Sequence, residues 1–166
     1  MNIEKLIKKL DLIPHPNEGG FFAETYRSKE NILEKDLPAR YSGERSFGTA
    51  IYYLLTPTTF SEIHRLKSDE IFHFYLGDPV EVVNLFPDGK IKKIILGQEI
   101  FAGMELQVIV PKMVWQGAKL IDGGNYALLG TTVSPGFDYN DYESGKKEDL
   151  LKLYPDFKDF IIKLTK

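Results

Sequence analysis

Two of the three histidines lie close to Glu70 within one short segment, SEIHRLKSDEIFHFYLG at residues 61 to 77. Imidazole nitrogens and a carboxylate can bind a divalent transition metal or transfer a proton near neutral pH. His64, Glu70 and His73 are therefore candidates for a metal or acid/base site. The alternative is structural, because a lone histidine in a strand is commonly half-buried with a backbone hydrogen-bond partner.

Any metal here must be bound by nitrogen and oxygen atoms, because the chain contains no cysteine. The same absence rules out a disulfide and a thiolate nucleophile. One divalent transition metal is the cofactor that this residue set would accept. A chain without cysteine also suits a reducing cytosol, and we expect a cytoplasmic location.

The composition favours one domain spanning residues 1 to 166, with 43% hydrophobic residues. With 21 basic and 24 acidic side chains, the net charge of −3 argues against a nucleic-acid partner. Charged residues interrupt the apolar amino terminus, so we do not expect it to be a secretory signal. No segment has the apolar length that a membrane span needs, and we expect no membrane partner.

Short β-rich runs separated by Gly, Pro and Asp occupy residues 20 to 133, without a long helical pattern that could supply a parallel crossover. This arrangement predicts an antiparallel barrel, and eight strands is a jelly-roll number. The predicted strands are 20–26, 49–55, 70–76, 80–86, 91–96, 106–110, 114–120 and 126–133.

Helical patterns flank the predicted barrel. Apolar residues recur at helical spacing in residues 2 to 11, and Pro14 ends that helix. Two short amphipathic helices are predicted within residues 146 to 165, divided by Pro155. We expect these helices to pack on the outside of the barrel.

The order of the candidate residues resembles the paired motifs of the cupin superfamily. In cupins the first motif supplies two histidines as HxH and a glutamate ahead of a glycine, and the second, PxGxxH, supplies another histidine. His64, Glu70 and Gly77 match the first motif, but Leu66 stands where the second histidine would be. In the second motif Gln116 stands in place of the histidine.

The resemblance implies a metal set of His64, Glu70 and Gln116. The amide oxygen of Gln116 is a weak neutral ligand, so we expect a loosely held metal or none. His73 is the less favoured ligand. In a strand Glu70, Phe72 and Phe74 share one face, so His73 faces outward if Glu70 faces the interior.

The whole chain also resembles a narrower group, the single-domain, RmlC-like cupins defined as a domain of unknown function and found in bacteria, fungi and plants. This likeness implies an all-β double-stranded β-helix, or jelly roll, a fold that hosts epimerases, isomerases, dioxygenases and storage proteins. With exposed-face aromatics such as Tyr75, it also suggests a homodimer. The segments that carry it are PHPNEGGFFAETYRS, TAIYYLL, SDEIFHFYLGDP, VPKMVWQGA and TTVSPGFDYNDYE.

An aromatic cavity with a few polar groups is expected around His64 and Glu70, of the kind that binds a small molecule. Strand parity places Arg27 opposite Glu24, where it would bind an anion at the rim or, as we favour, pair with an acid. Residues 134–143 read as a loop over the barrel mouth. The expected ligand-binding residues are Ser61, Trp115, Gln116, Glu24, Arg27 and Tyr53, with Tyr52 as the alternative to Tyr53.

Three functions are compatible with this sequence. The first is binding of a small polar metabolite, such as a sugar or sugar derivative, by a metal-dependent enzyme in which Glu70 is a ligand. The second is a metal-free epimerase or isomerase, with His64 as base and a tyrosine as acid. The third is a non-catalytic binding or storage protein. A chelator distinguishes the first two, because it abolishes the activity of a metal-dependent enzyme and leaves that of a metal-free enzyme unchanged.

Overall fold

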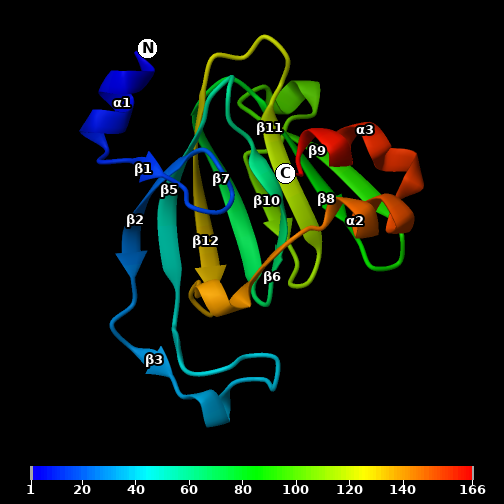
Figure 1. Ribbon diagram of the computed structural model, residues 1–166. Coiled ribbons are helices and arrows are strands. Elements are labelled where there is room, and N and C mark those ends of the chain that lie inside the picture. The colour runs from blue at the N-terminus through cyan, green and yellow to red at the C-terminus, as the bar shows by residue number, and fades with distance from the viewer. Residues whose placement is uncertain (1, 166) are drawn as a thin grey trace.

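The computed structural model describes residues 2 to 165 and contains two antiparallel sheets that face each other (Figure 1). The first contains, in order, β1 (Ile13–Pro14), β2 (Phe21–Arg27), β5 (Thr49–Leu55), β12 (Ala127–Ser134), β7 (Asp69–Gly77) and β10 (Gln107–Val110). The second contains β13 (Tyr142–Ser144), β6 (Ser61–Leu66), β11 (Trp115–Leu120), β8 (Val80–Leu85) and β9 (Ile91–Leu96). The predicted jelly-roll architecture is confirmed.

The main core lies between the two sheets, because alternate residues of each strand point inward. Tyr53, Phe72 and Leu129 come from the first sheet, and Val82 and Ala118 come from the second. All five are buried. The rest of the interior is apolar toward one end of the barrel, which leaves the polar inward residues together at the other end.

The predicted terminal helices cover the outer faces of the two sheets (Figure 1). Helix α1 (Ile3–Lys9) packs against the first sheet around Leu54 and Leu128. Helices α2 (Lys147–Leu153) and α3 (Lys158–Lys163) pack against the second. Short 3₁₀ turns occur at Glu34–Asp36, Ile100–Ala102, Tyr139–Asp141 and Pro155–Phe157. Within residues 2 to 165, no helix is long and apolar enough to span a membrane.

All eight predicted strands are present, but the prediction omitted β6, which carries His64. The reason is its inward face, where a histidine occupies a position that an ordinary core strand gives to an apolar residue. Ile63 of the same strand points the other way and packs beneath α2 and α3.

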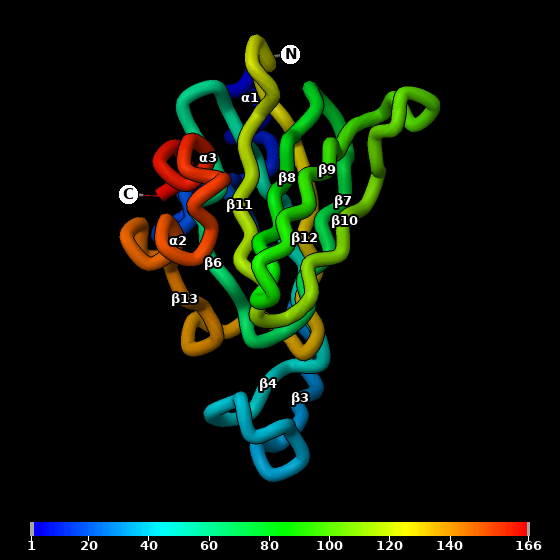
Figure 2. The backbone as a smooth tube through the Cα atoms, turned by 90° about the vertical axis from the view of Figure 1, so that its right-hand side faces the viewer, coloured from blue at the N-terminus to red at the C-terminus, as the bar shows by residue number. Residues whose placement is uncertain are grey.

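Between β2 and β5 the chain leaves the barrel as an arm, which contains the small sheet β3 (Asn31–Ile32) and β4 (Arg45–Ser46) (Figure 2). Arg45 anchors this arm to Asp141, donating from Nε and Nη2 to its two carboxylate oxygens, both at 2.7 Å. Both side chains are 3% exposed. Nη1 of Arg45 contacts the backbone carbonyl oxygens of residues 42–44 as a donor.

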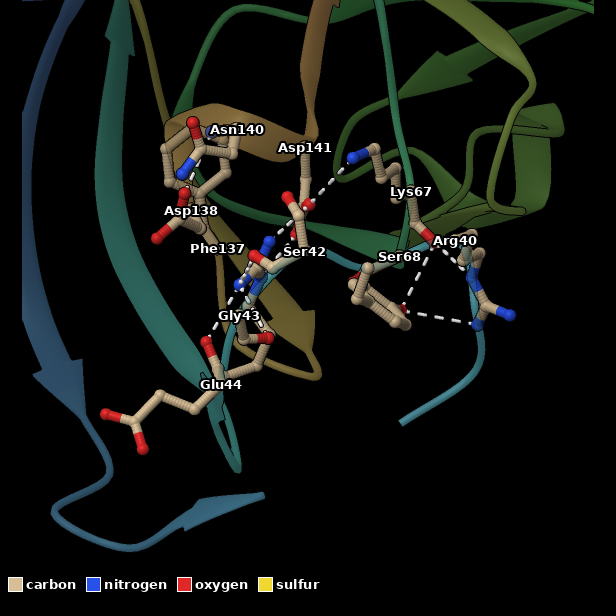
Figure 3. A network of polar contacts seen from close by, with 12 residues as sticks. Arg40, Ser42, Gly43, Glu44, Lys67, Ser68, Phe137, Asp138, Asn140 and Asp141 are labelled. Carbon is tan, nitrogen blue, oxygen red and sulfur yellow. Dashed lines mark hydrogen bonds and ion pairs between the residues drawn. The ribbon is translucent and has the colours of Figure 1, made fainter. Parts of the chain in front are cut away.

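Asp141 also receives a longer contact from Lys67, whose Nζ lies 3.6 Å from Oδ1 (Figure 3). Gly136 is fixed to the arm as well, because its N–H donates to the carbonyl oxygen of Ser46 at 2.8 Å. The segment from residue 134 to residue 144 therefore leaves the first sheet, is held by the arm, and joins the second sheet as β13. It forms one lip of the barrel.

Candidate functional site

A cavity of about 330 Å³ opens between this lip and the inner face of the first sheet. Its volume is at the low end of the range for small-molecule sites. Strands β2, β5, β7 and β12 supply one wall, and the lip supplies the other. The lining residues are His15, Glu18, Phe22, Glu24, Arg27, Thr49, Ile51, Glu70, Thr131, Val133, Phe137, Asp138 and Tyr139.

At the inner end, the structure brings together the three residues expected to form the site. Gln116 lies opposite His64 in the β6–β11 pair, and Glu70 reaches them from β7 on the facing sheet. Nε2 of Gln116 donates to Oε2 of Glu70 at 2.6 Å and lies 3.3 Å from Nε2 of His64. Glu70 is thus the member of this trio that lines the cavity.

A fourth residue, Glu18, joins this cluster from the loop before β2. Its Oε1 lies 3.6 Å from Nε2 of His64 and 3.7 Å from Nε2 of His15. Gly19 makes the required turn with φ of +92°, and a Cβ there would lie 2.6 Å from the carbonyl oxygen of Phe60. Glycine is therefore needed next to Glu18.

The two histidines differ in what they offer to Glu18: one presents a hydrogen-bond donor and the other an acceptor. Nδ1 of His64 lies 2.7 Å from the carbonyl oxygen of Glu62, which can only accept, so Nδ1 carries the proton and Nε2 is an acceptor. Nδ1 of His15 accepts from the N–H of Glu18 at 2.9 Å, so Nε2 of neutral His15 carries the proton. The carboxyl of Glu18 therefore lies between a donor and an acceptor, as a proton relay requires.

Burial changes the acidity of this cluster. It raises the pKa of Glu70 to about 7, with a further contribution from the negative charge of Glu18. Burial likewise raises the pKa of Glu18 and lowers that of His64. Near neutral pH Glu70 can therefore gain or lose a proton readily, while burial favours the neutral form of His64.

Replacing Glu18 by glutamine is expected to lower the pKa of Glu70 from about 7 toward its ordinary 4.5, because the neighbouring negative charge is lost. Carbon-13 NMR titration of the glutamate carboxyl signals measures this change. Gln keeps the size of the side chain, and Glu34→Gln on the exposed arm is the control. An unchanged pKa would assign the whole shift to burial.

The predicted residues at the mouth need one correction. Strand alternation predicts Glu24 and Arg27 on opposite faces, but both line the cavity, because the register between β2 and β5 shifts by one residue after Glu24. The favoured pairing of Arg27 is present: it donates to both oxygens of Glu24, at 3.0 and 2.7 Å.

Two more expected ligand-binding residues lie close to the cluster without lining the cavity. Tyr53 is 1% exposed, points inward, and donates to the carbonyl oxygen of Gly19 at 2.9 Å. Tyr52 instead contacts Tyr75 on the outer face. Ser61 is buried beside Tyr53 and Glu18.

The structure places Trp115 and His73 away from the cavity. Trp115 precedes the inward-facing Gln116 in β11, so it points outward and packs beneath α2 and α3. The guanidinium of Arg65 lies over its ring. His73 also faces outward, where Nε2 lies 3.0 Å from the hydroxyl of Thr132. The suggested homodimer contact at this face stays a prediction.

Sequence reasoning missed Glu18 and His15, although both lie in the segment PHPNEGG that carries the family resemblance. A pair of glycines after a glutamate was the available signal. The sequence did predict the lip at residues 134–143, which supplies Phe137 and Tyr139 to the cavity. Tyr142 of this lip stacks on His64, with ring centroids 5.0 Å apart.

The cluster as it stands does not fit a metal ion. No group of three or more His, Cys, Asp or Glu side chains with suitable geometry occurs within residues 2 to 165. Between His64 and Glu70, where a shared ion would bind, lies the donating nitrogen of Gln116. A donor in that position repels a cation, so we derive no step through a metal.

Comparison with known proteins identifies the family. Residues 4 to 145 match the family described as Cupin superfamily (DUF985). The chain belongs to the cupin superfamily. This cupin is 34% identical over 160 residues to uncharacterized protein YML079W of Saccharomyces cerevisiae, a match that covers 91% of this chain and 79% of the relative.

Solved structures place this cupin in the same fold. Protein SO0799 from Shewanella oneidensis is 33% identical with a TM-score of 0.87, covering 100% of this chain and 98% of that chain. A hypothetical protein from Leishmania major is 32% identical with a TM-score of 0.88 and 99% coverage of both chains. Oxalate decarboxylase of Bacillus subtilis, at 15% identity and a TM-score of 0.53, shares the fold over 37% of its chain.

Proposed function

We propose that this cupin binds a small polar metabolite, such as a sugar or sugar derivative, in the barrel cavity and moves a proton on it without a metal, as an isomerase or epimerase does. One observation carries the proposal: Glu70 lines the cavity, has a pKa of about 7, and lies in one cluster with Glu18 and His64. A carboxyl with a pKa near the working pH is well suited to general acid/base catalysis.

The proposed step assigns different roles to the two carboxyl groups. Ionised Glu70 takes a proton from the carbon next to a ligand carbonyl, while protonated Glu18 gives a proton to the carbonyl oxygen, which yields an enediol. Glu70 then returns its proton to the neighbouring carbon while ionised Glu18 takes the proton of the hydroxyl that becomes the new carbonyl, which completes isomerisation. In epimerisation the original carbon instead receives a proton from water on its other face, and Glu18 takes back the proton that it gave to the oxygen. His64 is fully buried, so it acts behind the carboxyl groups, where its Nε2 lies 3.6 Å from Oε1 of Glu18 and orients that carboxyl group.

The metal-dependent alternative depends on a rotation of Gln116 that would turn its oxygen toward His64 and Glu70. One of the oxalate decarboxylase structures is described by its Mn(II) centres, and at 15% identity that likeness supports only the shared fold. Elemental analysis of protein purified without a metal-affinity tag tests this alternative. We expect substoichiometric metal.

Deuterium exchange tests the proposed proton transfer. A panel of aldoses, ketoses and amino sugars is incubated with the protein in D₂O, and loss of the proton next to the carbonyl is followed by ¹H NMR. We expect exchange in at least one sugar, undiminished by EDTA and abolished in Glu70→Gln. Glu143→Gln, outside the cavity, is the control. Sugar binding without exchange would instead favour a non-catalytic cupin, and exchange abolished by EDTA would favour the metal-dependent enzyme.

A further inference from the structure

The cavity offers many hydrogen-bond acceptors and few free donors. Four acidic side chains line it, Glu18, Glu24, Glu70 and Asp138, against the single guanidinium of Arg27. A negatively charged ligand would be repelled by these four side chains. The charge of the lining therefore favours a ligand with positive charge.

Arg27 is already engaged and leaves little for an anion. Two of its nitrogens donate to the oxygens of Glu24, and Nη1 donates to the carbonyl oxygen of Phe137 at 3.2 Å. These contacts hold the guanidinium across the mouth between β2 and the lip. The bidentate geometry that would recognise a carboxylate or phosphate is thus used within the protein.

The inner end shows the same excess of acceptors. Nε2 of His64 has no proton, as its contact with Glu62 requires. The amide of Gln116 points into the cluster, where its nitrogen contacts Glu70, and its Oε1 is buried without a hydrogen-bond partner within residues 2 to 165. Gln116 is 2% exposed. This buried oxygen is an unused acceptor directly behind Glu70, the member of the cluster that lines the cavity.

Aromatic rings complete the lining. Phe22 lies on the strand side, and Phe137 and Tyr139 lie on the lip with ring centroids 5.0 Å apart. Aromatic faces attract ammonium groups and also pack against the carbon skeleton of a hydroxylated ligand. Carboxylates beside aromatic rings suit an amine in a way that they do not suit an anion.

We propose that the ligand of this cavity is a small hydroxylated amine, whose ammonium group binds to the acidic side chains of the lining, and that sugar phosphates and carboxylates are excluded. This inference deepens the proposed function, since it names the substrate class of the same site. Amino sugars belong to this class.

Three two-carbon probes of similar size test the charge preference: ethanolamine, ethylene glycol and glycolate. Each is titrated into ¹⁵N-labelled protein at constant ionic strength and about pH 8, above the pKa of about 7 of Glu70. We expect ethanolamine to shift the amides of cavity residues with an affinity at least about tenfold above that of the other two. Glycolate binding as tightly as ethanolamine, or no shift with ethanolamine, would overturn the inference.

Variants at the mouth sharpen the test. Glu24→Gln frees the guanidinium of Arg27 and removes a negative charge, so glycolate affinity should rise and ethanolamine affinity should fall. Glu143→Gln, paired to Arg65 outside the cavity, should change neither. If the ratio of ethanolamine affinity to glycolate affinity is unchanged in Glu24→Gln, the charge of the lining does not set the ligand preference. These titrations need no turnover. Selective binding of the amine without deuterium exchange would therefore refute the proposed function and leave this inference intact.

Discussion

Asp141→Asn is expected to lower the free energy of unfolding by about 3 to 5 kcal/mol, because it leaves the buried guanidinium of Arg45 without its negative partner. Burial is what makes the effect large, since both side chains are 3% exposed. Urea denaturation followed by circular dichroism measures the change. The loss also loosens the lip, so we expect weaker binding in the cavity.

The matched control is the pair of Arg65 and Glu143, which has the same bidentate form but is 27% and 53% exposed. Glu143→Gln should cost less than about 1 kcal/mol, because water screens the pair. The double variant Arg45→Met, Asp141→Leu should recover part of the loss, since no buried charge remains. If Asp141→Asn costs no more than Glu143→Gln, the buried pair does not hold the lip.

Glu70→Gln is expected to stabilise the protein by about 1 to 3 kcal/mol at about pH 8 and to have little effect near pH 4.5. Folding raises the pKa of Glu70 from 4.5 to about 7, so the folded state holds this proton more tightly than the unfolded state. The wild type therefore loses stability as pH rises through this interval, and levels off above it. Glutamine does not titrate and still accepts from Gln116.

Thermal unfolding of both proteins at a series of pH values measures this difference. It should grow between about pH 4.5 and 7 and then stay constant. Glu34→Gln on the exposed arm should show no such trend. A difference independent of pH would mean that Glu70 ionises with an ordinary pKa, which would also remove the main support for acid/base chemistry in the cavity.

Strand periodicity and turn residues were enough to predict eight strands and the terminal helices, and the resemblance of the motifs was enough to predict the family. They failed at β6, where a site histidine replaces an apolar inward residue, and at β2, where one extra residue turns Arg27 to the face of Glu24. Such a bulge depends on pairing with β5, which the sequence of β2 alone does not contain.

The site was predictable where residues were close in a strand or in a family motif. His64, Glu70 and Gln116 do meet, whereas Trp115 could have been excluded by the same alternation that places Gln116 inward. Glu18 was not predictable by spacing, because a loop with left-handed glycines brings it to the cluster at the inner end of the cavity. Acid/base character depends on burial, which only the fold defines.

The terminal helices change how the boundary of this protein should be drawn. The family match ends at residue 145, just before the segment that forms α2 and α3. Those helices cover Ile63 and Trp115, the outward neighbours of His64 and Gln116. A chain cut where the match ends would expose that apolar face behind the site, so the unit that folds is larger than the stretch by which the family is identified.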